Sequence, residues 1–221
     1  MTGVDEPEGH RLACAQLILR LRQFGVTHAP LLRAIEATPH EAFVPEEFAE
    51  HAYRDVSLPI ACGQSMTSPV TLARMIDLMG INGGVNSVLE IGTGSGYAAA
   101  LLSKLSRRVF TMDRYRTLLS QAETRWQTIG CANIVGLHGD GFEGLVSHAP
   151  FDRILVTGSI TEVPEILIEQ LADDGVLVAP LGEPNERQIL TRFERVDDTV
   201  IEREGGQVRL SALVQGKSRA L

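Results

Sequence analysis

Residues 88–99 read VLEIGTGSGYAA: an apolar run that predicts a strand, a turn with three glycines, and the start of a helix of small residues. Glycines between a strand and a helix let the backbone approach a ligand closely, and the helix N-terminus offers free N–H groups. In open α/β sheets, ligands bind at the carboxyl ends of the strands. The segment therefore predicts a nucleotide-type ligand site on an α/β fold.

Downstream of this segment, helix-length and strand-length stretches alternate. Strands rich in Val, Ile and Leu, separated by helices, predict a mostly parallel sheet covered on both faces, a doubly wound three-layer Rossmann-like sandwich. We expect strands at 109–113, 133–140, 153–158 and 175–181, and helices over about 70–79, 96–106, 115–129 and 163–171. Two further stretches, QILTRFERV (188–196) and VRLSALVQ (208–215), are expected to extend one edge as antiparallel strands.

The residues before the sheet have a different composition. Helical patterns over 11–24 and 29–37 end at Gly25 and near Pro39, and the stretch 53–69 is rich in Pro, Gly and Ser without regular periodicity, which predicts a loop. Long ordered loops often carry function. We therefore expect one domain, 1–221, in which residues 1–69 form a helical cap with a substrate loop and residues 70–221 form the ligand-binding core.

Composition excludes several classes of function. The 221 residues are 44% hydrophobic, enough for a sizeable core, and 20 basic against 28 acidic residues give a net charge of −8. That charge argues against nucleic acid or an anionic membrane as a partner. The three cysteines and six histidines show no metal-ligand spacing, and no leader or membrane-spanning run is visible. The expectation is a cytoplasmic monomer without a bound metal.

Two ligand classes fit the glycine turn. Gly94-x-Gly96-x-x-Ala99 satisfies the dinucleotide pattern, which would indicate an NAD-dependent oxidoreductase. However, Glu90 stands two residues before Gly92, where its carboxylate would repel a pyrophosphate but attract the ammonium and sulfonium groups of S-adenosylmethionine. The residues therefore favour a methyl donor over a dinucleotide.

Two more acidic residues follow predicted strands. Asp113 suits a carboxylate that bonds ribose hydroxyls, and the Gly139-Asp140-Gly141 corner could hold the adenine. The alternative for Asp113 and Asp140 is ordinary turn chemistry. Because parallel strands end at one edge of a sheet, we expect Glu90, Asp113 and Asp140 to converge on one pocket.

Several separate blocks, in order, resemble the protein L-isoaspartate (D-aspartate) O-methyltransferases, which repair age-damaged aspartyl and asparaginyl sites in proteins. The blocks are AFVP (42–45), AYRDVSLPI (52–60), GQSMTSP (63–69), VLEIGTGSGYAAALL (88–102), GDG (139–141) and APFDRILVTG (149–158). The resemblance implies S-adenosylmethionine as cofactor and damaged proteins or peptides bearing isoaspartate as partners. It assigns the donor to Glu90, Gly92, Gly94, Gly96, Asp113, Asp140 and Gly141.

The chain departs from this family's pattern on the acceptor side. The family's loop reads GQTISxP, and its serine, which lies beside the methyl-accepting carboxylate, falls on Thr67; Ser65 and Ser68 are flanking hydroxyls. A substrate-facing FVPL-like segment is replaced by Leu-Ser-Ala-Leu at 210–213. A different carboxylate acceptor, or a module that binds the cofactor without turnover, are the alternatives.

A carboxylate acceptor is already ionised at neutral pH, so methyl transfer to it requires positioning and desolvation rather than a general base. We expect Thr67 to be the catalytic residue, with its hydroxyl on the acceptor carboxylate. Tyr53 and Asp55 would shape the loop or a peptide groove, or else serve as a buried ring and a turn cap. Gln64 would contact the substrate or tie the loop to itself.

Overall fold

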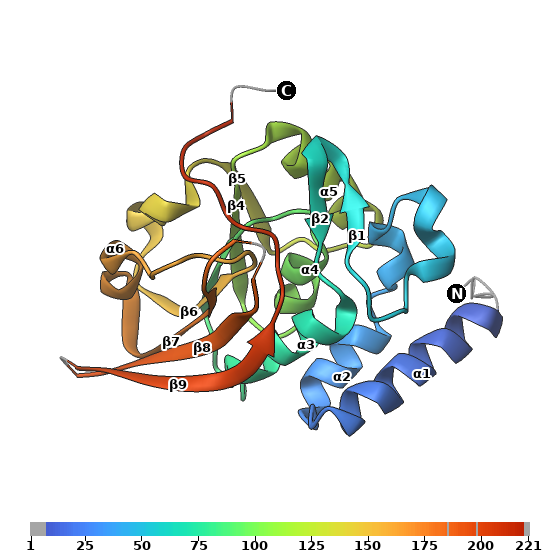
Figure 1. The fold of residues 1–221 in the computed structure, drawn as a ribbon, viewed down its shortest axis with the longest axis horizontal. Helices are drawn as coiled ribbons and strands as arrows, with labels where there is room; N and C mark the ends of the chain where they lie inside the picture. The colour runs from blue at the N-terminus through green and yellow to red at the C-terminus, as the bar shows by residue number, and fades with distance from the viewer. Residues whose placement is uncertain (1–7, 185, 198, 219–221) are drawn as a thin grey trace.

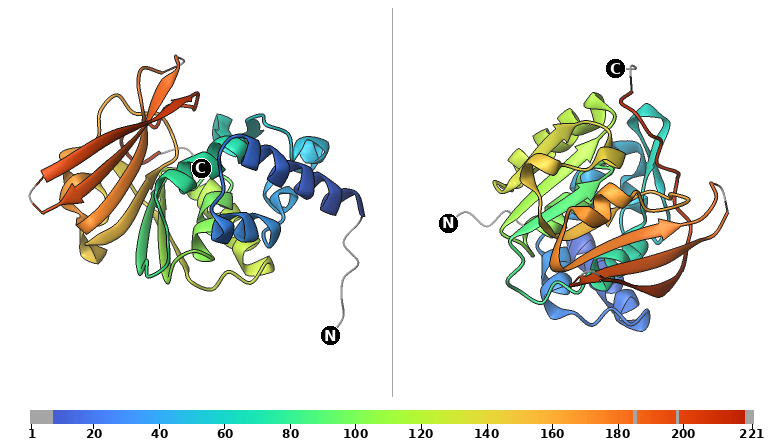
Figure 2. Two further views of the ribbon diagram at one scale, coloured as in Figure 1. Left: turned by 90° about the horizontal axis from the view of Figure 1, so that it is seen from below. Right: turned by 90° about the vertical axis from the view of Figure 1, so that its left-hand side faces the viewer.

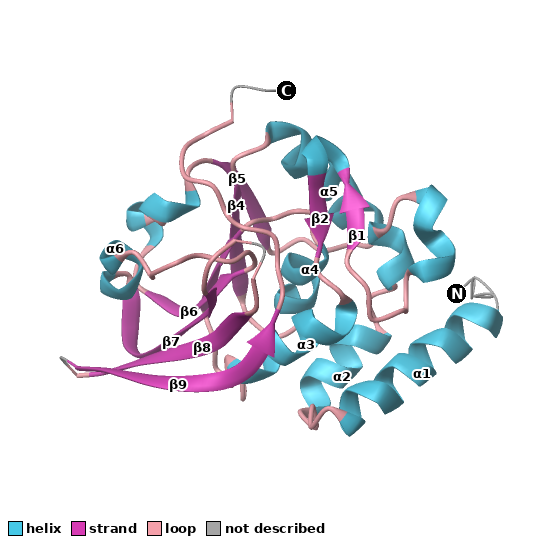
Figure 3. Ribbon diagram, viewed as in Figure 1, coloured by secondary structure: helices cyan, strands magenta, loops and turns pink. Residues whose placement is uncertain are grey.

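The computed structural model describes residues 8–184, 186–197 and 199–218. Within these residues, seven strands form one sheet in the order β5-β4-β3-β6-β7-β8-β9 (Figure 1, Figure 3). The strands are β3 (Ser87–Ile91), β4 (Arg108–Asp113), β5 (Ile134–His138), β6 (Phe151–Val156), β7 (Leu171–Leu181), β8 (Gln188–Val196) and β9 (Thr199–Val208). The α-helices are α1 (Glu8–Gln23), α2 (Ala29–Glu36), α3 (Pro69–Leu78), α4 (Tyr97–Ser103), α5 (Arg116–Thr128) and α6 (Glu165–Glu169).

Strands β3 to β7 are parallel, and β8 and β9 are added antiparallel at one edge. The predicted doubly wound α/β sandwich is confirmed. The first expected edge strand matches β8, but the second was placed wrongly, because β9 is Thr199–Val208 and not 208–215. Residues of the first part of β9 are exposed on both faces, so they lack the alternation that marks a half-buried strand.

The chain after β9 leaves the sheet instead of extending it. At Leu210 the backbone N–H bonds the side chain of Gln188 at 2.9 Å rather than a ladder partner. The following residues cross the carboxyl ends of the parallel strands, where an isolated parallel bridge joins Ser159 to Ala212. We call residues 209–218 the strap; Figure 1 shows it in red, running over the sheet towards the C-terminus.

Two apolar clusters cover the two faces of the sheet. On one face, Val88, Val109 and Val176 pack with the hydrophobic residues of α1 to α5. On the other face, Leu89 and Phe110 belong to a smaller cluster that includes Leu167 of α6. Figure 2 shows that the helices are gathered unevenly on the two faces. The second face carries the short helix α6, which ends at Glu169 because β7 already begins at Leu171, the partner of Phe151. This helix is shorter than the predicted range 163–171.

The N-terminal helix docks on this chain. Its residues Leu17, Ile18 and Leu21 are buried in the cluster shared with α2 and α3. The expected helices over 11–24 and 29–37 correspond to α1 and α2. The predicted cap is thus helical, although its first seven residues lie outside the described part of the chain.

The loop predicted over 53–69 contains regular structure. Strands β1 (Leu58–Ile60) and β2 (Gln64–Met66) form an antiparallel hairpin in which Ile60 pairs with Gln64. Its turn places Cys62 at φ 61° and Gly63 at φ 65°, both in the left-handed region. Each strand has three residues, too few for a periodic signal in the sequence. The hairpin stands beside the carboxyl edge of the main sheet.

Candidate active site

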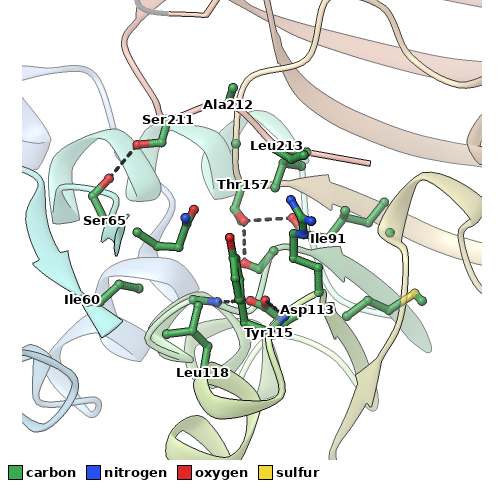
Figure 4. A pocket seen from close by; sticks show the side chains of 18 of the residues that line it. Ile60, Ser65, Ile91, Asp113, Tyr115, Leu118, Thr157, Ser211, Ala212 and Leu213 are labelled. Atoms are coloured by element: carbon green, nitrogen blue, oxygen red, sulfur yellow. Dashed lines mark hydrogen bonds between the residues drawn. The ribbon is translucent and has the colours of Figure 1, made fainter. Parts of the chain in front are cut away.

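A pocket opens where the carboxyl ends of β3, β4 and β6 meet the hairpin and the strap (Figure 4). Its walls come from six separate parts of the chain. Lining residues include Ile60, Gln64, Ser65, Ile91, Gly92, Gly94, Met112, Asp113, Arg114, Tyr115, Leu118, Gly141, Phe142, Thr157, Gly158, Ser211 and Leu213. An inner recess adjoins it and shares Ser65, Gly92, Gly94 and Thr157 with it.

The glycine turn brings the backbone to the pocket without side chains. Gly92 has φ +98°, and a Cβ there would lie 2.5 Å from Oγ1 of Thr157. Gly94 has φ +53°, and a Cβ there would meet only a methyl group of Ile60 at 3.7 Å, so open space lies above it. A ligand can therefore reach the backbone at Gly94.

Glu90 lies fully buried under this turn and faces the recess. Its Oε2 accepts a hydrogen bond from the Thr111 hydroxyl at 2.6 Å, while Oε1 is buried without a partner. Burial raises the pKa of Glu90 to about 8, against the opposing effect of the Thr111 bond. A buried carboxylate oxygen without a donor is unfavourable, and a cationic group in the recess would satisfy it.

Asp113 lies at the end of β4 and ties two turns together. One carboxylate oxygen accepts from the Gly94 N–H at 2.9 Å and the other from the Tyr115 N–H at 2.8 Å. Burial raises the pKa of Asp113, although these N–H groups act to lower it. The carboxylate lines the pocket and keeps lone pairs for hydroxyl donors of a ligand.

Asp140 and Gly96 are outside the lining residues of both the pocket and the recess. The Asp140 carboxylate accepts from the Phe142 N–H at 3.0 Å and from the Gly216 N–H of the strap at 2.7 Å. A Cβ at Gly96 would lie 2.8 Å from Cβ of Ala122, so this glycine permits close packing of α4 and α5. Gly141, the next residue after Asp140, does line the pocket.

On the acceptor side, the predicted residues divide into two groups. Thr67 lines the inner recess together with Glu90, and Gln64 and Ser65 line the main pocket. Gln64 also donates to the carbonyl of Cys62 at 3.2 Å, so it ties the hairpin turn to itself. These three side chains all come from the hairpin and the residue after it.

Tyr53, Asp55 and Ser68 do not line either cavity. The Ser68 hydroxyl caps α3 by accepting from the Thr71 N–H at 3.2 Å and donates to Asp55 at 2.6 Å. The Tyr53 hydroxyl donates to Glu41, and burial is the main cause that raises its pKa. These contacts join parts of the cap to each other and to the start of α3.

Sequence reasoning did not single out several lining residues. Thr157 at the end of β6 donates to the carbonyls of Ile91 and Gly92, at 2.9 and 2.6 Å. Its position could have been found from the rule that ligands meet carboxyl ends of parallel strands. Ser211 and Leu213 lie in the segment 210–213, which the family resemblance marked as the place of a substrate-facing segment, although the apolar pattern predicted an edge strand there.

No group of three or more His, Cys, Asp or Glu in the described ranges is placed to hold a metal ion. Nor does any helix of the described residues have the length and apolar character to cross a bilayer.

The residues present fit S-adenosylmethionine: the unpartnered oxygen of Glu90 would face its cationic group, Gly94 leaves open space, and Asp113 offers acceptors for ribose hydroxyls. The sheet topology and this site define an S-adenosylmethionine-dependent methyltransferase.

Comparison with known proteins specifies the class further. The family model for protein-L-isoaspartate (D-aspartate) O-methyltransferase matches residues 13–218. A protein-L-isoaspartate O-methyltransferase of Azorhizobium caulinodans is 44% identical over 99% of this chain and 100% of its own. One from Maricaulis maris is 45% identical over 93% of this chain and 96% of its own. The chain belongs to the protein-L-isoaspartate (D-aspartate) O-methyltransferase family.

Solved structures agree. A protein-L-isoaspartate O-methyltransferase superposes with a TM-score of 0.81 at 25% identity, covering 91% of this chain and 66% of that one. A Plasmodium falciparum protein solved in complex with S-adenosyl-L-homocysteine gives a TM-score of 0.78 at 20% identity, over 94% of this chain and 99% of its own. The second likeness supports the fold.

Proposed function

We propose that this protein transfers a methyl group from S-adenosylmethionine to the carboxylate of isoaspartyl residues in damaged proteins and peptides. One observation carries the proposal: the unpartnered carboxylate oxygen of Glu90 and the residue Thr67 line the same small recess. A carboxylate that would bind a cation and an acceptor-side hydroxyl therefore face the same recess. This arrangement suits a reaction between a positively charged methyl donor and an anionic acceptor.

Different residues of this chain would bind different parts of the donor. When bound, S-adenosylmethionine supplies an electrophilic methyl group on a positively charged sulfur. Glu90 would attract the positive end of the donor, Asp113 would accept from ribose hydroxyls, and the glycine turn would admit the donor to backbone distance.

On the acceptor side, the task is positioning. An isoaspartyl carboxylate is ionised at neutral pH, so no base has to remove a proton. The Thr67 hydroxyl would donate to one carboxylate oxygen and leave the other free to attack. The hairpin and the strap flank the pocket and would exclude water, which contributes to rate through alignment and desolvation.

Methyl transfer is tested directly with labelled donor. The purified chain is incubated with methyl-tritiated S-adenosylmethionine and a short peptide carrying one isoaspartate, and a peptide of identical sequence with normal aspartate serves as control. We expect labelling of the isoaspartyl peptide alone, and release of the label as methanol after base treatment. Equal labelling of both peptides would favour another carboxylate acceptor, and donor binding without any labelling would indicate a non-catalytic module.

The remaining expectations concern the molecular context. We propose that residues 1–221 act as one domain and as a monomer in the cytoplasm, on protein substrates and not on nucleic acid. The net charge of −8 supports the last point. Light scattering coupled to size-exclusion chromatography measures the oligomeric state, and a mass of twice the chain would contradict the monomer.

A further inference from the structure

Two serine hydroxyls join the hairpin to the strap across the pocket. Oγ of Ser65 in β2 lies 2.8 Å from Oγ of Ser211, and both residues line the pocket. Figure 4 shows the two side chains pointing towards each other at one edge of the pocket, Ser65 from the hairpin and Ser211 from the strap. They are 146 positions apart in the chain, so only the tertiary fold brings them together.

The strap holds Ser211 in a fixed position. Its carbonyl accepts from the Ser159 N–H at 2.9 Å, and the Leu213 N–H donates back to the Ser159 carbonyl at 2.9 Å. Further along, the Gly216 N–H bonds Asp140 at 2.7 Å. Because these hydrogen bonds fix the backbone of the strap around Ser211, its hydroxyl already lies beside Ser65 before any substrate binds.

The hydroxyl pair keeps one O–H group that can donate a hydrogen bond to a ligand. A serine hydroxyl carries one donor and two acceptor lone pairs. When one serine donates to the other, the second keeps its own O–H free, and this proton is a stronger donor because its oxygen is already accepting a bond. The pair is partly exposed to solvent, so the free O–H can reach an incoming group.

Ser65 and Thr67 are close enough to contact one bound peptide. Only Met66 separates them, so in extended chain their Cα atoms would lie about 6.6 Å apart, which is two residue steps of a peptide. Both also line the inner recess. An acceptor carboxylate at Thr67 would therefore have a neighbouring peptide group near Ser65.

We propose that the Ser65–Ser211 hydroxyl pair is a specificity-determining subsite that binds the backbone carbonyl next to the acceptor carboxylate. The inference rests on the proposed function and extends it from the acceptor group to the flanking peptide. Through this contact the pair selects an acceptor that is part of a chain over a free amino acid or a terminal residue.

The test compares variants and peptides together. Ser65→Ala, Ser211→Ala and the double variant are assayed with an isoaspartyl peptide and with two shortened peptides that both keep the isoaspartate. One ends at the isoaspartate, with its side-chain carboxyl capped as a methylamide, and the other begins at the isoaspartate. Ser147→Ala is the matched control, because its exposed hydroxyl bonds His148 away from the pocket. Thermal melting and donor affinity are measured for every variant.

We expect each single variant to raise KM for the full peptide about fivefold to tenfold, the usual effect of one lost neutral hydrogen bond. The value of kcat and the donor affinity should stay within twofold. The double variant should resemble the single ones, because the two hydroxyls act as a unit. One of the two shortened peptides lacks the carbonyl that the pair binds. With that peptide, the variants and the wild type should have the same KM.

Unchanged KM in both single variants would overturn the inference, and so would an equal loss with all three peptides, which would indicate a merely structural link. A lower kcat with unchanged KM would also contradict a binding role. These results leave the proposed function intact as long as the wild-type chain methylates the isoaspartyl peptide. If the wild-type chain methylates none of the peptides, the proposed function itself fails, and the subsite fails with it.

Discussion

The proposed donor side and the proposed acceptor side of the pocket are built from different kinds of contact. On the donor side, the Asp113 carboxylate accepts bonds from backbone N–H groups of Gly94 and Tyr115 close to the strand ends. On the acceptor side, side-chain hydroxyls join distant segments, as in the bond of Ser65 to Ser211. The first arrangement depends on the shape of the backbone, and the second depends on which side chains are present.

This difference predicts which substitutions affect cofactor binding and which affect the choice of substrate. Substitutions on the donor side disturb buried charge or backbone conformation and should remove cofactor binding. Substitutions on the acceptor side exchange one partly exposed hydroxyl at a time and should shift the choice of substrate. The four predictions below test this separation, from the largest expected effect to the smallest.

Gly92→Ala should abolish donor binding. The new methyl would lie 2.5 Å from Oγ1 of Thr157 at φ +98°, which combines backbone strain with overpacking and should lower the unfolding free energy by about 3 kcal/mol. Gly25→Ala is the control, since Gly25 has φ +86° with nothing within 4 Å and should cost only about 1 kcal/mol. Urea denaturation and calorimetric titration measure both, and equal losses in the two variants would contradict the prediction.

Glu90→Gln should remove the pH dependence of donor binding. In the free protein the pKa of Glu90 is about 8 because the carboxyl is buried, so it holds a proton at pH 6. A cationic donor favours the carboxylate, and binding therefore releases this proton below pH 8. The affinity of the wild type should rise with pH, by at most about tenfold per pH unit between 6 and 8, and then level off.

Calorimetry in buffers of different ionisation enthalpy detects the released proton, and Glu90→Gln should show neither the release nor the slope. The same pKa has the opposite effect on stability. Because the folded pKa lies above the unfolded one, the contribution of Glu90 is present below pH 4.5 and is lost as pH rises through 8. Relative to wild type, the glutamine variant should gain stability over this range, and a pH-independent affinity of the wild type would refute the role of Glu90.

Thr67→Val should lower kcat/KM for the isoaspartyl peptide about 10-fold to 100-fold, the range for a lost hydrogen bond to a charged group. The shape of the side chain is kept, so donor affinity should not change. Thr67→Ser retains the hydroxyl and should stay within about threefold of wild type. Initial rates with labelled donor measure both variants, and full activity in Thr67→Val would exclude the residue from the acceptor site.

Ser68→Ala should affect stability and leave catalysis almost unchanged. It removes the cap of α3 and the hydroxyl that donates to Asp55, at a cost of about 1 kcal/mol. Ser120→Ala, on the exposed face of α5, is the control and should be neutral or slightly stabilising. Denaturation and peptide methylation are both measured, and a fall in activity beyond about threefold would place Ser68 in the acceptor site after all.

Much of the core could be predicted because its signals are local. Apolar strands of Val, Ile and Leu and the glycines after β3 gave the α/β sandwich, and Glu90, Gly92, Gly94, Asp113 and Gly141 do line the pocket or the recess. Gly96 has the same spacing in the motif but packs against α5. A spacing pattern cannot tell a glycine that faces a ligand from one that faces a helix.

By itself, the sequence determined the succession of strands and helices and brought Glu90 and Asp113 to the adjoining recess and pocket, because hydrophobic periodicity and turn residues act over a few positions. Asp140 was expected to converge with them but bonds the strap instead. Only the tertiary structure decided the path of the strap, its anchoring on Asp140 and the meeting of Ser65 with Ser211. These contacts join segments that are distant along the chain, and no sequence pattern around a serine indicates which residue its hydroxyl will bond. The proposed donor site thus follows from local sequence patterns, whereas the proposed acceptor site depends on how the strap folds back over the sheet.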